Sequence, residues 1–117
     1  MSEGSAGGAR DTIGQVTSMT TDTLPASNGT VTEITLADDV AQVFFMPFAE
    51  AHFVVASQGE NNAAFESRKS ASPSTVAKVP ANTGVPIGVA GKKNQSVYFK
   101  ATETSASTYT LIIHEAG

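Results

Sequence analysis

The chain has no cysteine and no tryptophan in its 117 residues. Without cysteine it can form neither disulfide bonds nor thiolate metal sites. A small domain that lacks such cross-links is stabilised either by a well-packed core or by burial against other subunits. The missing cysteine therefore points to core packing, subunit contacts or both as the source of stability.

Long apolar runs are also missing. No stretch reaches the about 18 apolar residues that a transmembrane helix needs, so no membrane partner is expected. The start of the chain, Met-Ser-Glu-Gly-Ser-Ala-Gly-Gly, has neither a basic segment nor an apolar run, so no secretion signal is predicted. We expect a protein made in the cytoplasm of its host, and kept there or released by a route such as lysis.

Charge is scarce. Charged residues make up 15% of the chain and the formal net charge is −4, which gives no electrostatic basis for binding nucleic acid. Apolar residues, alanine included, account for only 40%, and Ser, Thr and Gly fill much of the remainder. A threonine-rich composition suits exposed sheet faces, where the branched Cβ packs well, and it suits helices poorly.

Few side chains could carry chemistry. The only histidines, His52 and His114, are far apart in sequence, and Glu50 with His52 makes only a weak pair. A cupin-type metal site would need clustered ligands instead. Asp38 and Asp39 are more typical of a solvated turn than of an acid–base dyad or a calcium loop. With no nucleophile elbow either, we predict no catalytic residue, cofactor or metal site, and hence not an enzyme.

The C-terminal part of the chain predicts four short strands. The runs are residues 75–79, 85–90, 96–102 and 107–115, each bounded by turn residues. In the last two runs apolar and polar side chains alternate, with Tyr109, Leu111 and Ile113 opposing Thr110, Ile112 and His114. Such spacing is typical of an antiparallel sandwich or barrel rather than of a βαβ enzyme.

The preceding part predicts strands at residues 30–36, 40–46 and 52–57, and a short strand at 63–68 with Phe65 buried. With no convincing helix, the fold class is all-β: an antiparallel, jelly-roll-like β-sandwich of about seven or eight strands over residues 30–117. The predicted core residues are Val43, Phe45, Phe53, Val55, Ile87, Val89, Val97, Phe99, Leu111 and Ile113.

Residues 1–29 are interpreted as a separate, extended N-terminal arm. Beyond Met1 their large apolar residues are Ile13, Val16, Met19 and Leu24, too few to offset an ordering cost of about 1–2 kcal/mol per residue. Two interpretations stay open: a disordered leader, or an arm that becomes ordered against a neighbouring subunit. Asn28 and Gly29 then predict a tight turn into the folded body.

Charge is unevenly distributed along the chain. Residues 60–100 hold six basic and two acidic side chains, a net charge of +4, which leaves −8 for the remainder. If the two groups lie on different faces, copies of the chain or an acidic surface could dock by complementarity. Alternatively, these are scattered lysines that discourage edge-to-edge aggregation. Lys92 and Lys93, at an expected hairpin tip, fit either role.

Three segments carry a resemblance to a known class of proteins. Residues 79–87 form a Pro- and Gly-bearing strand entry, residues 97–102 a strand with aromatic side chains that ends in Lys-Ala-Thr, and residues 109–113 a Tyr-Thr-Leu-Ile-Ile strand. Together they resemble small β-sandwich accessory virion proteins of tailed bacteriophages, the capsid decoration or cement type. The resemblance implies a structural viral protein of the virion without catalytic residues, forming a homo-oligomer, with a trimer favoured.

The predicted function is binding and stabilising a phage capsid through the N-terminal arm and subunit contacts. The expected partners are the major capsid protein or other virion proteins, and a neck, tail or fibre location stays open. The segment 44–48 is expected in the core or between protomers. The residues expected to bind partners are Ile13, Val16, Met19, Leu24, Phe44, Phe48, Lys92 and Lys93.

Two alternatives remain. One is a carbohydrate- or receptor-binding β-sandwich of the tail or fibre, although a chain with only Tyr98 and Tyr109 as tyrosines and no tryptophan has few aromatic platforms for a sugar. The other is a metal-dependent cupin-type enzyme built on the two histidines.

Overall fold

Strands make up most of the fold. The computed structural model describes residues 15–89 and 92–115, and in these it has eight β-strands and one α-helix. They are β1 (Gln15–Leu24), β2 (Thr32–Thr35), β3 (Val40–Pro47), β4 (Ala51–Ser57), α1 (Asn62–Ser70), β5 (Ala77–Val79), β6 (Val85–Gly88), β7 (Gln95–Ala101) and β8 (Ser107–Glu115).

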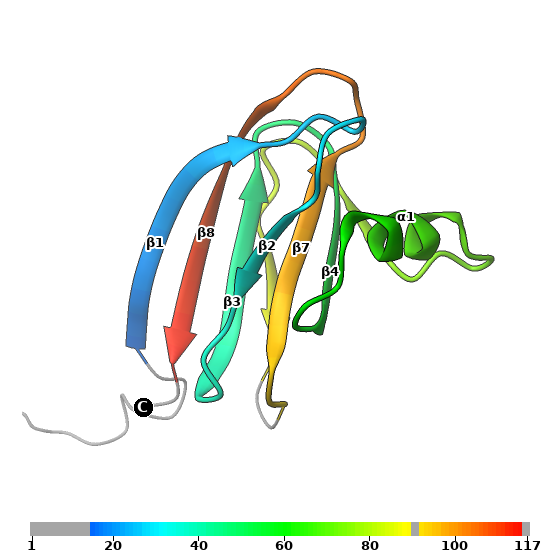
Figure 1. Cartoon of the computed structure of the whole chain (residues 1–117). Coiled ribbons are helices and arrows are strands. Elements are labelled where there is room, and N and C mark those ends of the chain that lie inside the picture. Colours follow the sequence, from blue (N-terminus) through cyan, green and yellow to red (C-terminus); the bar gives the residue numbers. More distant parts are fainter. Residues whose placement is uncertain (1–14, 90–91, 116–117) are drawn as a thin grey trace, which may run out of the picture.

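The strands form two four-stranded antiparallel sheets (Figure 1). Sheet 1 has the order β1-β8-β3-β6, and sheet 2 has the order β2-β7-β4-β5. Most connections cross from one sheet to the other, so neighbours within a sheet are seldom neighbours in sequence. The predicted all-β antiparallel sandwich is confirmed. The strand order is compatible with its jelly-roll-like form, which stays a prediction.

The core lies between the two sheets and is centred on aromatic rings. The ring centroid of Phe45 lies 4.6 Å from that of Phe53 and 4.8 Å from that of Phe99, and Tyr109 meets Phe99 edge-on at 4.5 Å. All ten predicted core residues belong to this core or pack against it. Val55, Ile87 and Ile113 are the three that are only partly buried, because they lie at its periphery.

Strand β7 is buried on both faces. Val97, Phe99 and Ala101 point into the core, as the predicted alternation requires. The opposite face, with Tyr98 and Lys100, is covered by the connection between β4 and β5, which includes α1. Strand β7 of sheet 2 is therefore enclosed between sheet 1 and the connection that includes α1.

The strand predicted at residues 63–68 is wrong, because these residues belong to α1. The side chain of Asn61 accepts a hydrogen bond from the backbone N–H of Ala64 and so caps the first turn. Arg68 and Lys69 lie in the last turn, where positive charge suits the helix dipole. Phe65 is buried, as predicted, but on a helix.

The predicted boundary of the arm at residue 29 is also wrong. Residues 15–24 form β1, which pairs along its length with β8 of the same chain. The hydroxyl oxygens of Thr21 and Thr110 lie 3.2 Å apart across this pair, and Leu24 is completely buried in the core. The sandwich thus begins by residue 15, and the earlier part of the expected arm lies outside the described residues.

Candidate functional site

The outer faces of the two sheets differ in what covers them. The outer face of sheet 2 carries α1, with Phe65 packed on Ala56 and Tyr98. In residues 15–89 and 92–115 no helix covers the outer face of sheet 1, because α1, their one helix, lies on sheet 2. A covering helix is therefore a feature of one outer face and not of the other.

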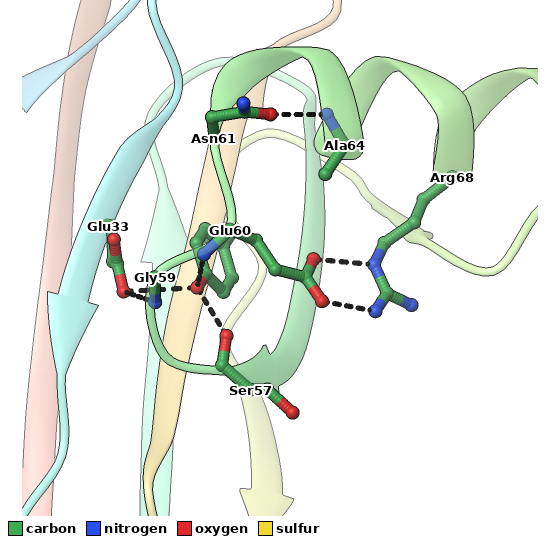
Figure 2. Close-up of polar contacts among 8 residues, drawn as sticks. Glu33, Ser57, Gly59, Glu60, Asn61, Ala64 and Arg68 are labelled. Atoms are coloured by element: carbon green, nitrogen blue, oxygen red, sulfur yellow. Dashed lines mark hydrogen bonds and ion pairs between the residues drawn. The ribbon is translucent and has the colours of Figure 1, made fainter.

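A polar network ties the turn before α1 to sheet 2 (Figure 2). The carboxylate oxygen Oε2 of Glu33 accepts hydrogen bonds from the Gly59 backbone N–H at 2.9 Å and from the Ser96 hydroxyl at 2.8 Å. These two donors hold the pKa of Glu33 below its ordinary value, the Gly59 N–H having the larger effect. Gly59 has a φ of 86°, a left-handed conformation that favours glycine.

The Tyr98 hydroxyl is the centre of this network. It accepts a hydrogen bond from the Glu60 backbone N–H at 3.0 Å. Its single proton faces two acceptors, the Ser57 carbonyl at 2.5 Å and the Glu33 carboxylate at 3.0 Å. Burial raises the pKa of Tyr98, and the Glu33 charge raises it further, so this hydroxyl stays protonated as a donor.

Glu60 and Arg68 join the start of α1 to its last turn (Figure 2). The guanidinium donates from Nε at 2.9 Å and from Nη2 at 2.7 Å to the two carboxylate oxygens of Glu60. This two-point hydrogen bond lowers the pKa of Glu60 and raises that of Arg68. The pair therefore stabilises the helix in its position on the sheet.

A second polar cluster lies further along the same face. The ammonium of Lys100, whose side chain is 1% exposed, donates to Glu66 and, at 3.1 Å, to the side-chain oxygen of Asn62. Lys69 pairs with the same Glu66 at 3.0 Å. The Lys100 hydrogen bond is the main cause of a lowered pKa for Glu66. A buried ammonium on sheet 2 is thus neutralised from α1.

His52 lies beside this cluster, opposite Lys100 and Lys78 in the ladder. Its Nδ1 is buried and has no hydrogen-bond partner within the described part of the chain. Burial lowers the pKa of His52, and the positive charges of Lys69 and Lys78 lower it further. At pH 7 the imidazole is therefore neutral.

Among residues 15–89 and 92–115, no group of three His, Asp or Glu side chains is placed to hold a metal ion. No helix in this part of the chain has the length and apolar character to cross a membrane.

The outer face of sheet 1 presents a row of apolar side chains that crosses all four strands. The ladder places Ile112 of β8 between Met19 of β1 and Phe44 of β3, and Pro86 of β6 lies beyond Phe44. Met19 is 67% exposed and Pro86 is also exposed, while Phe44 and Ile112 are half-buried. We call these four residues the sheet 1 row.

The next position along the strands is more polar. Met46 lies opposite Thr110, and Thr110 lies opposite Thr21. On the other side of the row, Gln42 lies opposite His114. The sheet 1 row is therefore an apolar strip flanked by Met46, Thr110 and Thr21 on one side and by Gln42 and His114 on the other. Exposed apolar strips with polar neighbours are typical of protein-binding surfaces.

The structure places the predicted partner-binding residues in different environments. It brings Met19 and Phe44 together in the sheet 1 row. The prediction that Leu24 contacts a partner is wrong, because its side chain is fully buried in the core. Phe48 follows β3 and is 38% exposed. Lys92 and Lys93 are exposed in the connection before β7. Val16 belongs to β1, and Ile13 lies outside the described residues.

Three of the six basic side chains in residues 60–100 pair with the two carboxylates of the same segment. Arg68 pairs with Glu60, while Lys69 and Lys100 both pair with Glu66. Lys78, Lys92 and Lys93 are exposed, on β5 and in the connection before β7. Half of the basic side chains of this segment therefore serve to fix α1, which is not a role that charge counting predicts.

Sequence reasoning missed Ile112 and Pro86 as members of the surface. A signal for Ile112 was present, since alternation along residues 107–115 already pointed it away from the core. Pro86 joins the row because β6 pairs with β3, and such long-range pairing is not visible in the sequence.

Comparison with known proteins adds no assignment: no protein-family model, no curated protein and no solved structure matches the chain.

Proposed function

We propose that the chain is a non-enzymatic structural protein that binds and stabilises a tailed-phage capsid as a decoration protein. The observation that supports it is the contrast between the two outer sheet faces. α1 covers part of the outer face of sheet 2, while the sheet 1 row has no covering helix among the described residues and includes the exposed Met19 and Pro86. The resemblance of residues 79–87, 97–102 and 109–113 to decoration proteins supplies the capsid as the partner.

Binding would depend on burial of the sheet 1 row against the capsid. Apolar surface contributes roughly 25 cal/mol for each Å² removed from water, so a strip spanning four strands gives a modest contact. Association also costs rotational and translational freedom, which one such contact offsets only in part. Many linked copies on one shell would raise the overall affinity well above that of a single contact.

The carbohydrate-binding alternative loses support from the placement of the tyrosines. Tyr98 and Tyr109 are 1% and 3% exposed, and both are held inside the domain. Neither ring is presented to solvent as a platform for a sugar. A glycan array tests this alternative directly. Saturable binding to a defined sugar would favour carbohydrate binding over the capsid role.

Immunogold electron microscopy tests the capsid proposal. An antibody raised against the chain is applied to phage particles purified from a lysate of cells that produce it. Regular labelling of the heads is expected. Absence of label from intact particles, or label confined to tails, would overturn the decoration role, and tail labelling would favour the adhesin alternative.

A pair of variants tests the surface. Ile112→Lys keeps an aliphatic stem but adds a charge to the middle of the sheet 1 row, so we expect loss of particle labelling with an unchanged circular dichroism spectrum. Thr35→Lys adds the same charge on exposed β2 of the other sheet and should label particles normally. Equal labelling by both variants would show that the sheet 1 row is not the capsid contact.

A further inference from the structure

Four strands lie at the edges of the two sheets, and three of them are protected against pairing. Strand β2 has four residues and carries Glu33, β5 has three residues and carries Lys78, and β6 has four residues and includes Pro86. Short length, charge and proline are the usual means by which natural sheets prevent a further strand from joining an edge.

Strand β1 differs from the other three edges. It is ten residues long, has no lysine, arginine or proline, and carries one charged side chain, Asp22. Residues 19–23 are exposed on both faces. Within the described residues only β8 pairs with it, which leaves its second edge open. In Figure 1 it lies at the opposite end of the view from α1.

The ladder shows which backbone groups of β1 face the open edge. The carbonyl of Thr108, the β8 partner of Thr23, accepts a hydrogen bond from Phe48 N–H, so it points away from β1. In an antiparallel pair, residues whose N–H and C=O groups point toward the partner strand alternate with residues whose groups point away from it. The N–H and C=O groups of Thr23, Thr21 and Met19 therefore point away from β8. In agreement, the Thr23 N–H is bonded to the Asp22 carboxylate at 2.7 Å and not to β8.

We infer that this open edge pairs with the β1 edge of a second copy of the chain, antiparallel about a two-fold axis. The two copies of sheet 1 would then form one continuous eight-stranded sheet. A second copy fits because an antiparallel strand pair is self-complementary under two-fold symmetry, so the same donors and acceptors meet from both sides.

The charge and side-chain pattern suits this pairing. Thr21 is the middle of the exposed stretch 19–23, and in a pair centred on it Met19 of each copy faces Thr23 of the other. Asp22 then faces Thr20, so the two aspartates do not oppose each other. Met19 also ends the sheet 1 row, so the rows of the two copies approach each other across the axis.

The solution mass of the full chain is the first test. We expect a species of twice 12.0 kDa in sedimentation equilibrium at two protein concentrations. A monomer at both concentrations would overturn the inference. A trimer would do so too, because a two-fold edge contact closes at two copies, and it would favour the trimeric state that the resemblance implies.

Cysteine cross-linking locates the contact. Opposed hydrogen-bonded residues in an antiparallel pair have Cα atoms about 5.5 Å apart, within the range of a disulfide. The chain has no other cysteine, so Thr21→Cys should form a covalent dimer under mild oxidation at low concentration. Thr35→Cys, on the exposed edge strand β2, is the matched control and should stay monomeric on a denaturing gel. Equal cross-linking of both would overturn the assignment.

A charge at the axis gives an independent measurement. Thr21→Lys places two ammonium groups opposite each other and should weaken dimerisation at least about tenfold while leaving the β8 ladder intact. Thr35→Lys should leave the dissociation constant of the dimer unchanged. A dimer unaffected by Thr21→Lys would contradict the proposed two-fold β1 contact. The dimer and the capsid role can fail separately, because these experiments contain no phage particle.

Discussion

The ring of Phe44 lies directly over the backbone of Gly84. A Cβ added at Gly84 would come within 2.0 Å of Phe44 Cζ and within 3 Å of both neighbouring ring carbons. Gly84 precedes β6, which pairs with β3 so that Phe44 faces Pro86. Phe44 is thus held in place on the outer face of sheet 1 by a position that accepts no side chain.

Gly84→Ala should therefore displace the Phe44 ring. We expect a loss of about 1–3 kcal/mol in the free energy of unfolding, as for other overpacked sites, measured by urea denaturation. The control is Gly88→Ala at the end of β6, where an added Cβ meets nothing within 4 Å. Because glycine is unfavourable within strands, that variant should be unchanged or about 0.5–1 kcal/mol more stable. Equal losses in both variants would contradict the Phe44–Gly84 contact.

Low pH should weaken the packing of α1 on sheet 2. The pKa values of Glu33, Glu60 and Glu66 are all lowered by hydrogen bonds made in the folded state. Their contribution to stability is therefore present above the unfolded-state value of about 4.3 and is lost as the pH falls through the lowered folded-state values. We expect the urea midpoint to fall between pH 5 and pH 3.

Glu33→Gln tests the source of that acid sensitivity. It removes one of the three titrating carboxylates, so the difference between the midpoints at pH 5 and pH 3 should shrink. Thr35→Ser on the same strand changes no charge and should keep the full difference. If Glu33→Gln keeps it as well, the Glu33 network does not contribute to the acid response.

Much of the fold could be predicted from alternation along the chain. In β8, Tyr109 and Leu111 are buried while Thr110 faces outward, and one face of the strand reads as core without reference to its partners. The aromatic residues Phe45 and Phe99 mark two further core strands. Alternation works in β8 and β3 because each of these strands has one face in the core between the sheets and a less buried face outside it.

β1 and α1, which the sequence did not predict, lack that contrast between a core face and an outer face. β1 is threonine-rich and exposed on both faces over residues 19–23, so no apolar period marks it as a strand. In α1, Phe65 is the only buried side chain, so no helical period is visible. The signals that could have identified α1 are Asn61 as a capping residue and the basic pair at its end.

The functional surface was predictable only in part, because the sheet 1 row is assembled by strand pairing. Met19 and Phe44 could be chosen as apolar residues, but their common neighbour Ile112 comes from the last strand. Pairings between strands so distant in sequence follow from the whole fold, and residue patterns within one strand do not encode them.

Removing Lys100 and removing Glu66 should change the free energy of unfolding by different amounts. Lys100→Met keeps a long apolar stem in a buried position and leaves Glu66 paired with Lys69, so we expect a change in unfolding free energy below about 1 kcal/mol. Glu66→Gln leaves a buried ammonium without its carboxylate. We expect a loss of about 2 kcal/mol, less than for a fully enclosed pair because Glu66 is partly exposed.

Chemical denaturation of both variants measures this asymmetry. Lys69→Met is the control, since it removes the other lysine on Glu66 from a more exposed position and should cost no more than about 1 kcal/mol. If Lys100→Met is the most destabilised of the three, the Lys100 ammonium contributes net stability, and the argument from its burial is wrong.

Truncation tests whether β1 is a structural strand of the sandwich. Deleting residues 1–14 leaves β1 complete, so thermal unfolding monitored by circular dichroism should change little. Deleting residues 1–20 removes more than half of β1, including Met19 and Thr20, and leaves much of that edge of β8 unpaired. Because the lost ladder also positions Leu24 in the core, we expect a melting temperature lower by several degrees, as for a loss of about 1–2 kcal/mol. Equal melting temperatures for the two truncations would mean that β1 is an appendage on β8 and not a structural strand of the sandwich.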